Sequence, residues 1–152
     1  MKSLIIIYLL LSANYINAQA PELAYSQEIF DSSTCCWCKL SAEDKHTEAG
    51  KLIVEYINHS PNAANKHSLK WHAGQMYAAA GNNKKAITYY KKTYNIFYKW
   101  FGDAGWYYYA KGNVAYLKKD KAKLKKIISK WEKKKLERDI NYKALVEMLE
   151  KL

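Results

Sequence analysis

Apolar residues recur at helical spacing on both sides of a Gly-Asn-Asn turn in residues 71–94. The residues that share a helix face are Ala73, Gly74 and Tyr77 before the turn and Ala86, Ile87 and Tyr90 after it. Gly81 stands where a helix would end in a left-handed cap. The pattern predicts two short amphipathic helices joined as a hairpin.

Apolar stripes at the same spacing occur before and after this hairpin. Residues 43–58 and 106–117 each predict a helix, and Asp120 is a suitable N-cap for another. The last helix begins near Asp139. Their apolar residues include Trp106 and Leu117 in the helix at 106–117, Leu124, Ile127, Ile128 and Trp131 in the helix after Asp120, and Ile140, Leu145 and Leu149 in the last helix. No alternating strand pattern of useful length occurs, so the sequence predicts an all-α fold of about seven helices.

The apolar positions of the hairpin recur 38 residues later in the chain. The pairs are Gly74 with Gly112, Met76 with Val114, Asn82 with Asp120, Ala86 with Leu124 and Tyr90 with Ile128. With Tyr77 and Gly81 added, this pattern resembles a tetratricopeptide repeat, whose first helix carries small and aromatic residues and whose second helix begins after a Gly-Asp-like turn.

The resemblance implies antiparallel helical hairpins stacked as a short α-solenoid. Its helical domain would span residues 41–152, after an N-terminal segment at 19–40, with units at about 63–98 and 104–134 and a capping helix at 139–152. Two departures stand out. The shift exceeds the family's period by four residues, which we place in the loop around 101–105, and Leu124 replaces a small residue. An irregular helical bundle would show the same stripes.

The family places its ligand groove on the first helices of successive units. Carried over to this sequence, the residues predicted to bind a partner are Trp71, Gln75, Trp106, Tyr109, Asn113 and Tyr116, with Ala78 and Ala79 beside them. Rings supply buried area at low entropic cost, and amides pair with a peptide backbone. The resemblance therefore implies a protein or peptide ligand; the alternative is that Trp71 and Trp106 belong to the core.

Cys35, Cys36 and Cys38 form a compact cluster that allows three interpretations. One pair could form a structural disulfide and leave an odd thiol. All three thiols could instead be inert. The Cys35–Cys38 spacing also suits redox chemistry, and three thiolates with His46 could bind a metal, although adjacent cysteines point poorly at one ion. We predict no metal site, because His67 and His72 are also five residues apart, off the spacing of a helical metal pair.

Residues 1–18 have the pattern of a secretory signal peptide. Lys2 precedes an apolar run over residues 4–11, and Ile16-Asn17-Ala18 ends the segment. This run is too short to span a bilayer, and no second long apolar stretch follows. We therefore expect cleavage after Ala18, a secreted or periplasmic protein, and no transmembrane segment in the mature chain.

Most of the net charge of +11 is concentrated near the C-terminus. Residues 111–135 hold 11 lysines against Asp120 and Glu132. Lysine is a point charge without the planar fork that suits bases and phosphates, and the chain has a single arginine, so we expect no nucleic-acid partner. This segment could be a solvated helix face, or it could dock on an acidic protein or an anionic membrane.

No catalytic constellation is recognisable in the sequence. It offers no Ser-His-Asp order, no paired carboxylates in a glycine-rich setting and no phosphate-binding loop. The sequence thus predicts a non-enzymatic protein without a cofactor that binds a protein or peptide, including an acidic one. A thiol-redox or metal-handling protein and a basic surface-binding protein are the alternatives.

Overall fold

The computed structural model describes residues 20–133 and 140–152, and over these residues the protein contains helices and no strands. The elements are η1 Pro21–Ala24, α1 Gln27–Phe30, α2 Cys36–Ala42, α3 His46–His59, α4 Lys66–Ala79, α5 Asn83–Lys91, α6 Ile96–Phe101, α7 Ala104–Leu117, α8 Lys121–Glu132 and α9 Ile140–Glu150. The all-α prediction is confirmed. The expected signal peptide, residues 1–18, lies outside the described residues.

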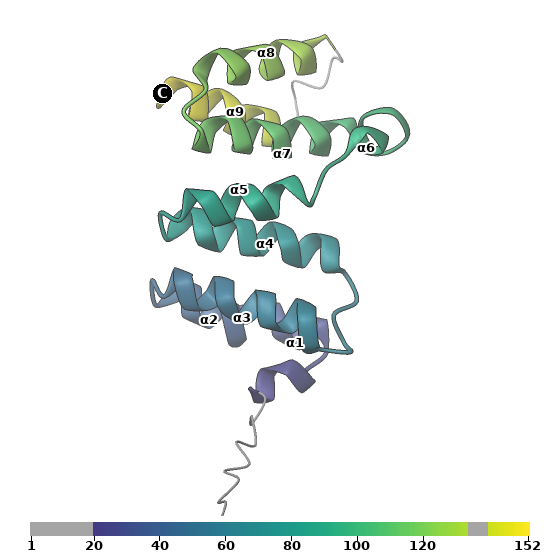
Figure 1. The fold of residues 1–152 in the computed structure, drawn as a ribbon, viewed down its shortest axis with the longest axis vertical. Helices are drawn as coiled ribbons and strands as arrows, with labels where there is room; N and C mark the ends of the chain where they lie inside the picture. The colour runs from purple at the N-terminus through teal and green to yellow at the C-terminus, as the bar shows by residue number, and fades with distance from the viewer. Residues whose placement is uncertain (1–19, 134–139) are drawn as a thin grey trace, which may run out of the picture.

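Three helical hairpins, α2–α3, α4–α5 and α7–α8, lie one above another along the long axis of the molecule (Figure 1). Helix α4 packs against α3 on one side and α5 on the other, and α5 in turn packs against α7. Helix α9 packs against both α7 and α8. Each layer thus buries the apolar face that its neighbour leaves open.

The turns inside the three hairpins have the same geometry. Asp44, Gly81 and Lys119 all have positive φ, at 57°, 73° and 56°. In each hairpin the next residue donates its amide to a carbonyl five residues back, at 2.9, 2.8 and 3.0 Å. This is the bond of a helix that ends in a left-handed residue. Of the three, only Gly81 adopts that conformation without the steric cost of a Cβ.

Helix α5 and helix α8 begin with the side-chain caps that the turn residues permit. Asn82 accepts a hydrogen bond from the Lys85 amide at 3.1 Å, and Asp120 accepts one from Lys123 at 2.9 Å. The predicted Asp120 cap is therefore confirmed. Helix α3 has no such cap and begins at His46, three residues after the predicted start, because residues 36–42 form α2.

Small residues allow the helices to approach closely at two points. A Cβ on Gly74 would lie 2.5 Å from the Tyr90 ring of α5, and a Cβ on Gly112 would lie 2.5 Å from the side chain of Leu145 in α9. Both distances are below van der Waals contact. The first contact joins α4 to its hairpin partner, whereas the second joins the C-terminal helix to the stack.

The segment before α3 is part of the packed structure. Leu23, Phe30 and Cys36 are buried in one cluster with Ile53 and Tyr56 of α3. Phe30 stacks on Tyr56 with ring centroids 3.8 Å apart, and the Tyr56 hydroxyl donates to the Tyr25 carbonyl at 2.8 Å. The cysteine region therefore shares its core with the first hairpin.

Helix α6 occupies the connection between the second and third hairpins. The sequence predicts the end of the unit before it at about 98 and the extra loop around 101–105, and α6 overlaps both. It packs on α7 and projects from the side of the stack (Figure 1). Over the part of the chain that the structure describes, no helix is both long enough and apolar enough to cross a lipid bilayer.

Candidate functional site

Aromatic and polar side chains connect α2 to α4 on one side of the stack. The Trp37 ring of α2 stacks on His72 of α4, with ring centroids 4.9 Å apart. His72 Nδ1 donates to the Gln75 side-chain oxygen at 2.9 Å, and its Nε2 forms a hydrogen bond with the Ser68 hydroxyl at 3.2 Å. All four side chains are half-buried. These contacts give the imidazole a fixed orientation.

A second aromatic cluster connects α4 to α7. The Trp71 ring lies 4.6 Å from Trp106 and 5.2 Å from Tyr109, and it also contacts Tyr90 of α5 at 4.5 Å. The Trp106 indole donates to the Thr93 carbonyl at 2.9 Å. Helices α2, α4 and α7 are the first helices of their hairpins. The side chains that they contribute to the two clusters are together called the first-helix face: Trp37, Ser68, Trp71, His72, Gln75, Trp106 and Tyr109.

The structure places the six predicted partner-binding residues at two depths. Trp71 and Asn113 are buried, with 7% and 6% of their surface exposed, so their side chains form core contacts. Trp71 fills the space between α4, α5 and α7, and the Asn113 amide donates to the Tyr109 carbonyl at 3.0 Å. Gln75, Trp106, Tyr109 and Tyr116 are half-buried and reach the surface.

Burial changes the acidity of the tyrosine on this face. Desolvation raises the pKa of Tyr109 above its ordinary value, and the hydrogen bond with Asn113 lowers it by less. The phenol is therefore neutral near neutral pH. It can offer a partner a ring and a hydroxyl but no charge.

The cysteine cluster contains one bond and one thiol. Cys35 is bonded to Cys36, the latter buried and in the left-handed region with φ 53°. The free Cys38 thiol lies 3.5 Å from the Asp31 carbonyl. Burial, and then the charge of Asp31, raise the pKa of Cys38 above its ordinary value. The thiolate that redox or metal chemistry needs is thus disfavoured.

The cluster has no assembled metal site around it. Within residues 20–133 and 140–152, no three His, Cys, Asp or Glu side chains lie close enough together to hold a metal ion. His46, which we considered as a ligand beside the cysteines, lies near the Ser41 hydroxyl at 3.5 Å and the Asp44 carboxylate at 3.6 Å.

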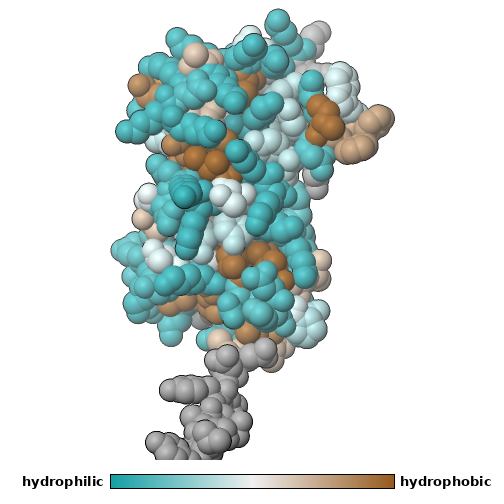
Figure 2. Space-filling view, viewed as in Figure 1, coloured by the Kyte–Doolittle hydropathy of each residue, from teal (hydrophilic) through white to brown (hydrophobic). Residues whose placement is uncertain are grey.

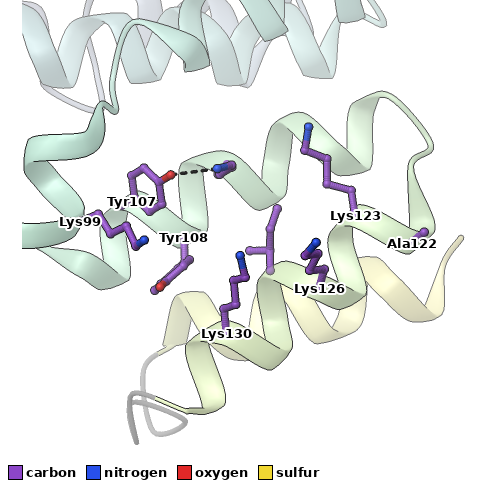
Figure 3. A pocket seen from close by; sticks show the side chains of 9 residues that line it. Lys99, Tyr107, Tyr108, Ala122, Lys123, Lys126 and Lys130 are labelled. Atoms are coloured by element: carbon purple, nitrogen blue, oxygen red, sulfur yellow. Dashed lines mark hydrogen bonds between the residues drawn. The ribbon is translucent and has the colours of Figure 1, made fainter.

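A cavity of about 490 Å³ lies between α7 and α8, beside α6. Five lysines line it with Tyr107, Tyr108, Ala122 and Ile127: Lys99, Lys111, Lys123, Lys126 and Lys130. Figure 3 shows Lys99 reaching it from α6 while the lysines of α8 surround its other side. Lys111 donates to the Tyr107 hydroxyl at 2.9 Å. We call this hollow the lysine pocket.

Among the residues that the structure describes, no carboxylate lines the lysine pocket. The ion pairs of the described residues all lie between residues 43 and 59. Repulsion among these ammonium groups is not offset by any ion pair of the described residues, which favours an anionic ligand.

Sequence reasoning did not place Trp37, Ser68 and His72 on the first-helix face, or Lys99 in the lysine pocket. His72 directly follows the predicted Trp71, and Trp37 precedes Trp71 by one period of the family. That spacing is the signal that could have found Trp37. Lys99 lies outside the lysine-rich segment, and only the packing of α6 on α7 brings it to the pocket.

Comparisons with protein-family models, with curated proteins and with solved structures found none that matches this chain. The described residues define its class by fold alone, as an all-α protein built of layered helical hairpins.

Proposed function

We propose that this protein is a non-enzymatic binding scaffold of the tetratricopeptide type, and that its first-helix face takes a peptide or protein partner. The observation that carries the proposal is the pair of aromatic and polar clusters on three successive first helices, one joining α2 to α4 and the other joining α4 to α7. Half-buried Trp, Tyr and His side chains are typical of recognition surfaces, because they are held rigidly yet offer large contact areas.

The three hairpins support the repeat assignment in this proposal. Their turn residues Asp44, Gly81 and Lys119 are almost evenly spaced along the chain and share one conformation. Trp71 and Tyr109 each stand ten residues before the turn residue of their hairpin, whereas Trp37 stands seven residues before Asp44. Recurrence of the turn in all three hairpins, and of the ring in the second and third, favours a repeat over an irregular bundle.

The thiol alternative has less support from the geometry. The Cys38 thiol is half-buried with a raised pKa, and Cys35 and Cys36 are bonded to each other. We assign these residues a structural role at the start of α2. With the predicted signal peptide, the proposal describes a scaffold that works in a periplasmic or extracellular space.

Selection of short random peptides displayed on phage tests the proposal. We expect peptides enriched on the purified protein to bind the His72→Ala/Gln75→Ala variant at least about tenfold more weakly, a loss of about 1.4 kcal/mol or more. Both side chains are half-buried and their backbone belongs to a long helix, so the fold should persist.

The matched control is Asn58→Ala/His59→Ala, which removes an amide and an imidazole from exposed positions near the end of α3. Binding of the same peptides to the control should equal binding to the wild type. Equal affinity for all three proteins, with circular dichroism showing each to be folded, would contradict the proposal.

A further inference from the structure

Most of the large hydrophobic side chains that the described residues expose belong to one short helix. Ile96, Phe97, Trp100 and Phe101 of α6 are exposed by 53%, 67%, 63% and 86%. At spacings of one, four and five residues they share one side of the helix. A soluble domain rarely exposes so much apolar surface in one place without a partner for it.

The apolar side of α6 projects away from the helical layers. Figure 2 shows this hydrophobic group standing out from the stack at the position of α6 in Figure 1. Asn95 caps the helix by accepting from the Phe97 amide at 2.9 Å, and Gly102 ends it. The exposed rings are therefore carried by an ordered turn of helix and not by an extended loop.

The lysine pocket adjoins this apolar tip. Lys99 belongs to α6 and lines the pocket, and its ammonium group lies 4.5 Å from the centre of the Trp100 ring. Positive charge and exposed aromatic surface thus meet within one helix. A partner that covers both the lysines and the exposed rings needs an apolar region bordered by negative charge.

We propose that α6 and the lysine pocket form a docking site for an anionic phospholipid membrane. The rings of α6 would enter the boundary between headgroups and acyl chains, where aromatic side chains are favoured. The lysines would lie at the level of the headgroup phosphates, with their aliphatic stems along the apolar surface. This inference is independent of the partner proposed for the first-helix face.

Two observations favour a membrane over a soluble acidic protein. The basic residues of the site are all lysines, whose point charges suit a diffuse layer of phosphates better than the paired geometry of a protein carboxylate. The apolar group is a projection and not a groove, so a fluid phase can close around it. The charge of the pocket explains the preference for anionic lipid.

Co-sedimentation of the mature chain, residues 19–152, with vesicles tests this inference. We expect binding to vesicles of phosphatidylcholine mixed with phosphatidylglycerol, and little binding to phosphatidylcholine alone. Trp100→Ser/Phe101→Ser and Lys126→Gln/Lys130→Gln should each lower the partition coefficient at least about tenfold, and added salt should weaken the wild type further. All four positions are exposed, so the fold should be retained.

The controls separate this site from general charge and hydrophobicity. Lys84→Gln/Lys91→Gln removes two exposed lysines of α5, and Ile29→Ser removes an exposed apolar residue of α1. Both should partition like the wild type. Equal losses in the controls, equal binding to neutral vesicles, or binding only to soluble polyglutamate with the α6 variant unaffected would each overturn the inference.

Discussion

Replacement of Trp71 by alanine is expected to lower the free energy of unfolding by about 3–5 kcal/mol. The indole is 7% exposed and contacts Tyr90 of its own hairpin and Trp106 and Tyr109 of the next. Removing it leaves a cavity at the junction of α4, α5 and α7, which these rigid helices cannot fill by relaxing. Urea denaturation followed by circular dichroism measures the effect.

Trp100→Ala is the matched control for this prediction. The same side chain is removed from α6, where it is 63% exposed, so stability should change by no more than about 0.5 kcal/mol. If Trp71→Ala were as stable as Trp100→Ala, Trp71 would be a surface residue and the packing of the second hairpin on the third would be wrong.

Leu145→Ala in α9 is expected to cost about 2–5 kcal/mol, because its side chain is fully buried against α7. Gly112→Ala should also destabilise, by about 1–3 kcal/mol, since the added Cβ would lie 2.5 Å from Leu145 Cδ1. The two changes are complementary: the methyl group at position 112 takes space that the shortened side chain at 145 leaves.

The double variant should therefore cost less than the two single variants together, with a coupling of about 0.5–3 kcal/mol. Denaturation of the wild type, both single variants and the double variant gives this coupling. Additive losses within error would mean that α9 does not rest on Gly112, and the closure of the last layer would need another explanation. Lys143→Ala, at an exposed position of α9, serves as the control.

The central hairpin was predictable because its local signals agree. Gly81 requires a turn, Asn82 can cap a helix, and the small residues at 73, 74 and 86 leave room for rings. Helix α2 was not predictable, since it is short and includes cysteines but no apolar stripe. Helix α6 was not predictable for a related reason. It is too short to show a helical period, and its aromatic side chains are exposed and not packed in a core.

The candidate sites were predictable only as residue types. The sequence indicated rings and amides on the first helices, but the burial of Trp71 depends on Trp106, which is distant in the sequence, and on the angle between two layers. The lysine run was visible in the sequence. The pocket that these lysines form with Lys99 and Tyr107 was not visible in the sequence, because it forms only when α6 packs on α7.

Hydroxyl-radical footprinting with a selected peptide tests most directly whether the first-helix face binds a partner. Trp37 and Tyr109 are half-buried rings on that face, and Phe101 is an exposed ring outside it. The proposed function predicts that peptide binding lowers the oxidation rates of Trp37 and Tyr109 and leaves that of Phe101 unchanged. Unchanged oxidation of Trp37 and Tyr109 in the saturated complex, with protection elsewhere, would contradict it.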